Sequence, residues 1–263
     1  MKQKWFISIL CIMAIVVIFF VGKHDYDSKT NPSTKLNPKL ETQNPNGESQ
    51  DRRSQPLNEV KPEPPARRSQ TQTLVNIKDI DDNILVDLKY ATADNFTGIA
   101  LYEGINGAYL QPDVARMLSK AHSYLKTLHP DLRLLVYDAT RPLSVQWIMW
   151  NRVKDTPYHR YVAHPNRLSL HNYGAAVDLT IADSLGQSLD MGTPFDYFGR
   201  AAGTSDEQGL IRQGILNRQQ VYNRQLLRQV MHHAGFRSIS GEWWHFNACS
   251  LQEAKQRYTL IEN

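Results

Sequence analysis

The chain has 263 residues, with 30 Lys and Arg side chains against 26 Asp and Glu, which gives a formal net charge of +4. The positive excess lies in residues 1–72, which hold 11 basic and 7 acidic residues, so residues 73–263 hold 19 of each. A neutral folded part excludes a nucleic-acid-binding domain, which carries its basic residues on the folded module. Two cysteines, Cys11 and Cys249, exclude a disulfide framework and a cysteine-rich zinc module.

Residues 1–22 predict a membrane anchor or signal segment. Lys2 and Lys4 precede an uncharged, apolar run over 5–22, which is long enough for a short transmembrane helix of about 17–25 residues. The run is followed by no pair of small residues suited to a signal peptidase, which favours an uncleaved anchor over a cleaved signal peptide. Because basic residues stay on the cytoplasmic side, we expect the rest of the chain in the cell envelope, on the periplasmic or extracellular side.

Residues 23–72 predict a disordered linker. They contain seven of the 13 prolines and many Ser, Thr, Asn, Gln and Lys residues, with few large apolar side chains. Such a segment cannot bury enough apolar surface to offset the entropy of ordering it. We therefore expect one folded domain over 73–263, tethered at a distance from the membrane.

The elements of that domain follow in chain order from the hydrophobic pattern. Strands are predicted at 74–77, 84–90 and 132–137, the last apolar enough for the centre of a sheet. Helices are expected to begin at Pro112, with Val114, Met117, Leu118, Ala121 and Leu125 on one face, and at Pro142, through Val145, Ile148 and Met149. A half-buried strand is predicted over 175–181, and a helix over 217–234 that Gly235 ends. Strands and helices do not alternate regularly, which favours an α+β fold.

Two short stretches carry residues suited to metal chemistry. They are Ser169-Leu170-His171-Asn172-Tyr173-Gly174-Ala175-Ala176-Val177-Asp178 and Gly241-Glu242-Trp243-Trp244-His245-Phe246. A catalytic zinc ion takes three ligands from His, Asp or Glu and keeps a fourth position for water. His171, Asp178 and His245 would supply that set, with one Zn²⁺ per chain.

Glu242 and Arg141 are candidates for catalysis beside the metal. Glu242 lies three residues before His245, an odd offset that places the two side chains on opposite faces of a regular strand. We therefore expect Glu242 at a strand start or bulge, near the metal without binding it, where a general base belongs. Arg141 follows an apolar strand and precedes a helix, so its guanidinium is placed to stabilise an oxyanion.

Simpler interpretations of the same residues remain open at this point. A single histidine is more often a surface or structural residue than a ligand, and Asp178 on a strand with one apolar face fits a solvent-facing carboxylate. Arg141 fits an ion pair at a turn equally well. The two tryptophans at 243 and 244 are more typical of a core than of a substrate platform.

The pattern Ser-x-His-x-x-Gly-x-Ala-x-Asp followed by Glu-x-Trp-His resembles the zinc D-Ala-D-Ala peptidases, a group that includes lysostaphin-like enzymes and the hedgehog signalling domain. Within it, the chain is similar to the VanX-type D-alanyl-D-alanine dipeptidases. The resemblance extends from about residue 84 to 247. Its further motifs are Asp87-Leu88-Lys89-Tyr90-Ala91-Thr92-Ala93-Asp94-Asn95-Phe96-Thr97-Gly98, Thr140-Arg141-Pro142 and Met191-Gly192-Thr193-Pro194-Phe195-Asp196.

The resemblance implies a central antiparallel sheet flanked by helices, with the zinc site on the sheet. It implies zinc ligands at His171, Asp178 and His245, a base at Glu242 and a transition-state stabiliser at Arg141. It further implies that three residues hold the dipeptide, with the last contacting its free ammonium group: Ser169, Tyr90 and Asp196.

The expected activity is hydrolysis of the D-alanyl-D-alanine dipeptide to two D-alanines. Because the domain is expected outside the cytoplasm, we interpret its role as cell-wall peptide turnover or scavenging, with the membrane contacted through the N-terminal segment. One alternative is a D,D-carboxypeptidase or endopeptidase that acts on the stem peptides of peptidoglycan. Another is a non-catalytic zinc-containing binding module, against which Glu242 and Arg141 argue.

Overall fold

A computed structural model describes residues 73–263 of the chain. The segments predicted to be a membrane anchor and a linker, 1–22 and 23–72, lie outside these residues and stay predictions. Within residues 73–263, every helix is too short or too polar to cross a bilayer.

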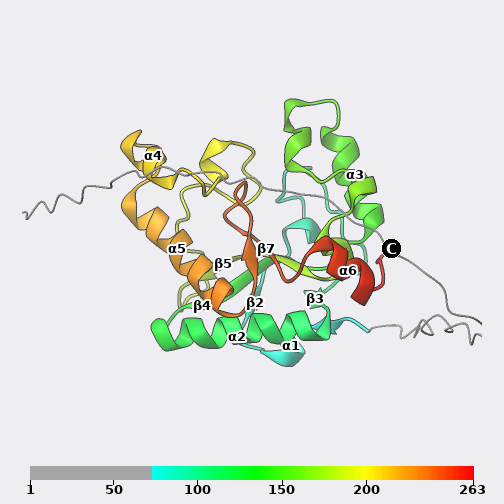
Figure 1. The fold of residues 1–263 in the computed structure, drawn as a ribbon, viewed down its shortest axis with the longest axis horizontal. Helices are drawn as coiled ribbons and strands as arrows, with labels where there is room; N and C mark the ends of the chain where they lie inside the picture. Colours follow the sequence, from blue (N-terminus) through cyan, green and yellow to red (C-terminus); the bar gives the residue numbers. More distant parts are fainter. Residues whose placement is uncertain (1–72) are drawn as a thin grey trace, which may run out of the picture. The chain divides into compact units, whose positions relative to one another are not determined.

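A five-stranded sheet in the order β2-β4-β5-β7-β6 forms the centre of the fold (Figure 1). Its strands are β2 (Leu85–Val86), β4 (Arg133–Asp138), β5 (Ala176–Ala182), β6 (Arg237–Ser238) and β7 (His245–Asn247). All neighbouring strands are antiparallel except β2 and β4, which are parallel. A small separate sheet pairs β1 (Val75–Asn76) with β3 (Tyr109–Leu110). The α+β class is confirmed, and the parallel pair at one edge is a detail that the sequence did not indicate.

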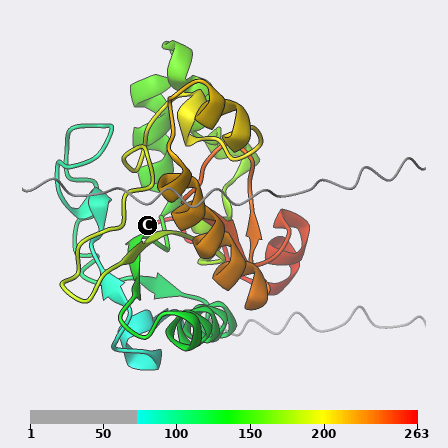
Figure 2. The same ribbon diagram turned by 90° about the vertical axis from the view of Figure 1, so that its left-hand side faces the viewer.

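Two long helices pack together over this sheet, α2 (Pro112–Leu128) and α5 (Arg218–His233), as Figures 1 and 2 show from two directions. A third, α3 (Leu143–Val153), lies at the other end of the molecule from α2. The shorter helical elements are α1 (Ile77–Ile80), α4 (Glu207–Arg212), α6 (Leu251–Arg257), η1 (Lys89–Ala91), η2 (Pro157–Tyr161), η3 (Pro165–Arg167), η4 (Leu170–Tyr173) and η5 (Arg200–Ala202).

The ends of α2 and α5 follow from local chemistry. Pro112 opens α2 at a position where its missing N–H costs no hydrogen bond. The side chain of Asn217 accepts the backbone N–H of Gln220, and the Gln220 side chain accepts the N–H of Asn217, which together close the start of α5. Gly235 follows α5 with φ of 101°, a conformation that favours glycine at a helix end. Both predicted helices are confirmed.

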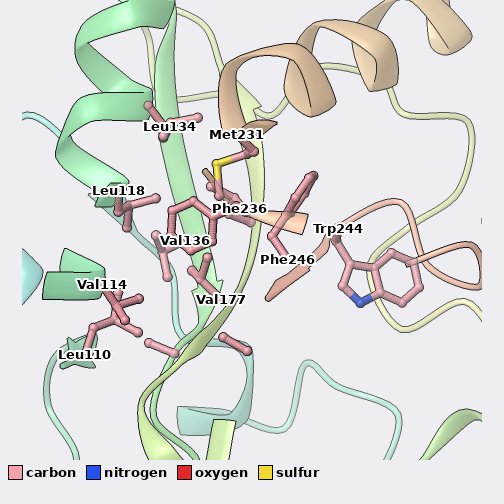
Figure 3. Close-up of a cluster of buried hydrophobic side chains, with 14 of the residues drawn as sticks. Leu110, Val114, Leu118, Leu134, Val136, Val177, Met231, Phe236, Trp244 and Phe246 are labelled. Carbon is pink, nitrogen blue, oxygen red and sulfur yellow. The ribbon is translucent and has the colours of Figure 1, made fainter. Parts of the chain in front are cut away.

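The main core lies between the sheet and these two helices. Figure 3 shows Leu118 of α2, Val136 of β4, Val177 of β5 and Met231 of α5 meeting in it, and all four are fully buried. A second, smaller cluster gathers around α3 and η1, and its buried members are Tyr90, Leu101, Tyr102, Val145, Met149, Val153 and Val162. Residues of both clusters line the pocket described below, so the pocket lies where the two meet.

Four of the predicted elements differ from those observed. The run 74–77 is a strand only at Val75–Asn76 and then turns into α1, and 84–90 is a strand only at Leu85–Val86, because η1 begins at Lys89. Ile148 of α3 is 46% exposed, so it does not share the buried face of Val145. The strand predicted as half-buried is buried along its whole length, including the residues that alternate with its apolar ones, and of these only Asp178 lines the pocket.

The sheet register places three polar residues in one row. Asp138 of β4 pairs with Asp178 of β5, which in turn pairs with His245 of β7. The register shifts between Val136 and Asp138, a bulge that redirects the strand end as bulges commonly do beside functional sites. The row crosses the sheet from strand to strand, and it is the foundation of the site.

Candidate active site

His171, Asp178 and His245 bring three potential metal ligands to one point. His171 Nε2 lies 3.2 Å from His245 Nδ1, and Asp178 Oδ1 lies 3.3 Å and 2.9 Å from these two nitrogens. All three ligand atoms lie within 4.8 Å of one another, the arrangement expected of a metal site. The structure thus brings together the complete ligand set that the sequence predicted.

The outer hydrogen bonds of the two imidazoles fix which nitrogen faces the centre. His171 Nδ1 lies 2.6 Å from the carbonyl oxygen of Ala139, to which it donates, so Nε2 carries the lone pair. His245 Nε2 donates to Asn247 Oδ1 at 2.8 Å, which leaves the lone pair on Nδ1. Two lone pairs and a carboxylate oxygen therefore point at one spot, where only a cation removes their mutual repulsion. A carbonyl or amide oxygen behind each ligating histidine is the usual support of a metal centre.

Asp178 stays ionised in this setting. It is 3% exposed, and burial opposes its ionisation. In the metal-free site, protonated His171 and His245 outweigh that effect through their charges and hydrogen bonds and hold the pKa of the Asp178 carboxyl well below its usual range. With the neutral rings described above, a bound cation would supply the positive charge instead. The centre therefore offers a negative ligand at neutral pH, as a divalent cation requires.

The turn that carries His171 is closed at both ends. Ser169 accepts the His171 N–H at 3.3 Å, and Asn172 Oδ1 accepts the Ser169 N–H at 2.8 Å, so the two residues form a capping box around η4. Gly174 ends the turn at φ of 62°, where a side chain would press against Thr140 and Leu74. This turn also holds the backbone of Arg141, whose N–H donates to the His171 carbonyl at 3.0 Å.

Arg141 is buried in a network of acceptors. Its Nε and Nη2 donate to Asp138 Oδ2 at 2.9 Å and 2.5 Å, its Nη1 donates to Gln146 Oε1 at 3.1 Å, and its Nη2 reaches Asp178 Oδ2 at 3.4 Å. Asp138 also accepts the Tyr102 hydroxyl. Burial lowers the pKa of Arg141, but Asp138, Tyr90, Tyr102 and Asp178 together more than compensate and raise it well above its usual value, so the guanidinium stays protonated. Four of its five N–H donors are engaged by described residues, which leaves one for a ligand beside the metal ligands.

Glu242 lies in the irregular segment just before β7 and lines the same pocket as the three ligands. This is the position at a strand start that its offset from His245 required. Burial raises the pKa of Glu242 to about 7, although nearby His245 pulls it down. A carboxyl group with a pKa near neutrality can both accept and release a proton at physiological pH.

Tyr90 and Asp196 meet in the same pocket. The Tyr90 hydroxyl donates to Asp196 Oδ1 at 3.0 Å, and the Tyr90 ring lies 5.1 Å from the Arg141 guanidinium. Asp196 Oδ2 is buried and has no hydrogen-bond partner within residues 73–263. Burial, followed by the charge of Asp178, raises the pKa of Asp196 to about 7. A buried carboxylate oxygen without a donor is suited to a cationic ligand.

The pocket has a cavity volume of about 380 Å³. Each of the eight residues predicted for the site lines it. Its wall also includes Phe96, Tyr161 and Phe198, whose rings pack together, with Tyr161 and Phe198 stacked at 5.1 Å. The polar side chains thus form one part of the pocket and aromatic rings another.

Three features of the site were missed by sequence reasoning. Asp138, which accepts from Arg141, is the last residue of an apolar strand. A carboxylate at the end of a buried strand needs a partner, so the sequence did carry a signal for its role. Asn247, which orients His245, lies two residues further along the same strand face, a spacing that also was available. The packing of Phe198 with Phe96 joins segments about a hundred residues apart and left no sequence signal.

Comparisons with known proteins identify the family of the chain. Residues 70–261 match the M15 peptidase family described as D-Ala-D-Ala dipeptidase. A D-alanyl-D-alanine dipeptidase of Escherichia coli (strain K12) is 35% identical over 178 residues, which cover 68% of this chain and 86% of that protein. One of Enterococcus faecium is 32% identical over 183 residues, which cover 61% and 83%.

Among solved structures, the chain was compared with a zinc-bound Glu-to-Ala variant of the vancomycin resistance D,D-pentapeptidase VanY from a VanB-type cassette. The TM-score is 0.33, with 13% identity over 59% of this chain and 81% of that one. The family match, by contrast, spans nearly all of the described residues. The chain belongs to the D-Ala-D-Ala dipeptidase family and is a metallopeptidase.

Proposed function

We propose that the protein hydrolyses the D-alanyl-D-alanine dipeptide to two D-alanines, with one Zn²⁺ per chain. The observation that carries the proposal is the convergence of three lone pairs, from His171, Asp178 and His245, next to Glu242 and Arg141. Family membership supports the substrate class.

Two imidazole nitrogens and one carboxylate oxygen form a ligand set that suits zinc. A zinc ion held by His171, Asp178 and His245 would lower the pKa of water and polarise an amide carbonyl. Asp178 contributes the negative charge, and Ala139 and Asn247 hold the two histidine rings in orientation.

Glu242 is the proton carrier of the proposed reaction. Its carboxylate accepts a proton from the attacking water and, as the amide bond breaks, delivers that proton to the nitrogen of the leaving D-alanine. A pKa of about 7 suits both halves of this task, because neither protonation state is strongly favoured at neutral pH.

Arg141 stabilises the negative charge that develops on the amide carbonyl oxygen. Its bonds to Asp138 fix the guanidinium before substrate binds, and the free N–H is the second one of Nη1, whose other N–H donates to Gln146. A fixed, buried donor of this kind stabilises charge more effectively than water, which has to reorient.

Asp196 and Tyr90 recognise the free amino group of the dipeptide. Asp196 Oδ2 has no partner within the described residues, and the Tyr90 hydroxyl holds the other oxygen of the same carboxylate. An ammonium group supplies the missing donor, whereas the amide of a longer peptide places a neutral group and further chain against the carboxylate. This argument favours a dipeptidase over a D,D-carboxypeptidase or endopeptidase. Ser169 lines the remaining part of the pocket.

The role in the cell follows from the predicted N-terminal anchor. With residues 1–22 in the membrane and the domain outside the cytoplasm, the dipeptide available to the enzyme is one released from the cell wall. We therefore assign the enzyme to cell-wall peptide turnover or scavenging.

The test uses the zinc-loaded full-length protein and four substrates: D-Ala-D-Ala, L-Ala-L-Ala, N-acetyl-D-Ala-D-Ala and a stem pentapeptide ending in D-Ala-D-Ala. We expect release of D-alanine from the first substrate at a much higher kcat/KM than from the others, one zinc per chain by elemental analysis, and loss of activity with a chelator that zinc restores. Cleavage of the pentapeptide without cleavage of the dipeptide would establish the carboxypeptidase instead. Zinc binding without any cleavage would establish the binding module.

A further inference from the structure

Arg224, in the middle of α5, is a charged side chain that the proposed chemistry does not use. It is 0% exposed and is the largest of the fully buried side chains in the described part of the chain. Burying a guanidinium is costly unless its donors are paired. The partners of Arg224 therefore indicate what it holds in place.

Those partners are backbone carbonyls at both ends of one loop, residues 191–203. Arg224 Nε donates to the carbonyl of Met191 at 2.6 Å, and Nη2 donates to that of Ala201 at 2.9 Å, with Nη1 at 3.4 Å from that of Gly203. The planar fork thus joins the first residues of the loop to its last ones. Lysine lacks this geometry, because its ammonium is a single point.

Neighbouring side chains fasten the same loop. Asn223 Nδ2 donates to the carbonyl of Asp190 at 2.8 Å, just before the loop begins. Trp243 Nε1 donates to Thr193 Oγ1 at 2.8 Å, and the guanidinium of Arg224 lies 6.0 Å from the Trp243 ring. Trp243 directly follows Glu242. Arg224 therefore connects the loop with the chain segment that carries the proposed base.

The middle of the loop is packed by side chains, with the Phe195 ring against Tyr90 and Trp244 and the Phe198 ring against Phe96, but its backbone has few fixed partners. Its only regular element in the described structure is η5 at Arg200–Ala202, so no strand ladder fixes it. Yet it carries Asp196 at φ of 59°, a left-handed conformation that a non-glycine residue keeps only when its surroundings enforce it. The position of the Asp196 carboxylate thus depends on how firmly the two ends of the loop are held.

We propose that Arg224 is a positioning residue for substrate selection. Its guanidinium holds loop 191–203 in the conformation in which Asp196 receives the free ammonium group of the dipeptide. The inference rests on the proposed function for the identity of that ammonium group. It adds that a side chain on α5, outside the pocket, sets the preference for dipeptides with a free amino end.

The test compares Arg224→Gln with Arg228→Gln. Arg228 lies one turn further along α5 and donates to Glu207, which is outside the loop, at 2.9 Å and 2.6 Å. Glu207 also lies 3.9 Å from Arg224 Nη1, so Arg228→Gln is the control for disturbing this carboxylate while the bonds of Arg224 to the loop carbonyls stay intact. In Arg224→Gln we expect KM for D-Ala-D-Ala to rise about 10- to 100-fold, the effect of losing a charged hydrogen bond. The kcat/KM for N-acetyl-D-Ala-D-Ala should change less than about 3-fold, because that substrate has no ammonium group. Arg228→Gln should leave the ratio between the two substrates unchanged.

A double-variant cycle separates positioning from general support of the fold. Once Asp196→Asn has removed the carboxylate, adding Arg224→Gln should raise KM by less than about 2-fold further. Equal losses with both substrates, or full additivity with Asp196→Asn, would overturn the proposal. If Arg224→Gln does not fold, Asn223→Ala loosens the same loop at Asp190 and should shift the substrate ratio in the same direction.

Hydrogen exchange gives a measurement that does not depend on the substrate. Amides of residues 191–203 should exchange at least about 10-fold faster in Arg224→Gln than in the wild type and Arg228→Gln, while those of β5 keep their protection. Unchanged exchange in the loop would overturn the proposal that Arg224 holds it. If the wild type fails to cleave D-Ala-D-Ala while exchange follows this expectation, the proposed function fails but Arg224 does hold the loop.

Discussion

Asp178 and His245 stand on paired strands, whereas Asp196, in the same pocket, stands on a loop. The strand residues are placed by the backbone ladder of β5 and β7, which also aligns them with Asp138 of β4. Asp196 is placed by side chains, through Tyr90 and the loop contacts of Arg224. The difference separates two tasks: two of the three proposed metal ligands rest on the sheet, and the group proposed for substrate choice rests on a loop that can change without disturbing the sheet.

The sharpest test of this separation is on the cleavage side. Glu242→Gln should lower kcat about 10²- to 10⁴-fold, because the proton carrier is gone, while zinc stays bound. His245→Ala should lose both turnover and zinc, because it removes one of three ligands. Activity assays paired with elemental analysis of zinc measure both effects. Substantial dipeptidase activity in Glu242→Gln would exclude Glu242 as the base.

The second prediction concerns the residue that holds Arg141. Asp138→Asn should lower kcat about 10²-fold, since the guanidinium loses its fixed orientation, with zinc content unchanged. Breaking a buried ion pair should also cost about 3–5 kcal/mol of unfolding free energy, measured by urea denaturation. Asp94→Asn is the control, because Asp94 pairs with Lys89 at 2.9 Å with its own side chain 81% exposed and should contribute less than about 1 kcal/mol. An unchanged kcat in Asp138→Asn would mean that Arg141 is positioned by other contacts.

The same separation explains what the sequence could and could not predict. The start of α2 and both ends of α5 were predicted to within a residue or two, since Pro112, Asn217 and Gly235 mark them through local chemistry. The ligands His171 and Asp178 were predictable because their motif is local to one turn and one strand, and His245 was predictable because it lies in a second short motif with Glu242. The burial of β5 on both faces was not, because alternating residues along a strand do not indicate what covers each face.

Contacts between distant segments could not be predicted from the sequence either. Nothing near Arg224 in the sequence indicates that its guanidinium ends on Met191 and Ala201, because those bonds are made only after α5 packs against the loop. The loop of Asp196 lacks periodicity altogether. Its functional residue was identified through the family resemblance, whereas the means by which it is held became visible in the structure.

The third prediction tests whether Asn247 orients His245, the proposed zinc ligand on β7. Asn247→Ala removes the oxygen that accepts from His245 Nε2 at 2.8 Å and frees the ring to turn. Supports of this kind typically change metal affinity about 10- to 100-fold, so we expect the zinc Kd to rise by that factor in a chelator competition assay. Asn83→Ala, an exposed position in the turn before β2, is the control and should leave the Kd unchanged. An unaltered Kd in Asn247→Ala would mean that strand pairing alone orients His245.

The last and smallest expected effect concerns Asp196 on loop 191–203 and the pH dependence of the unfolding free energy. The pKa of Asp196 is about 7 in the folded protein against an ordinary 3.8, so its contribution to stability is fully present below pH 3.8 and is lost as the pH rises through 7. Between pH 6 and pH 8 the metal-free wild type should therefore lose about 1–2 kcal/mol more unfolding free energy than Asp196→Asn. Asparagine tolerates the left-handed backbone at this position, so the comparison isolates the charge. Urea denaturation at the two pH values measures the difference. If the unfolding free energy of both proteins depends on pH in the same way, the pKa of Asp196 is not raised in the folded protein. If the difference is found, the loop keeps a carboxylate where a neutral residue would be more stable, as expected of a group retained to bind an ammonium ion.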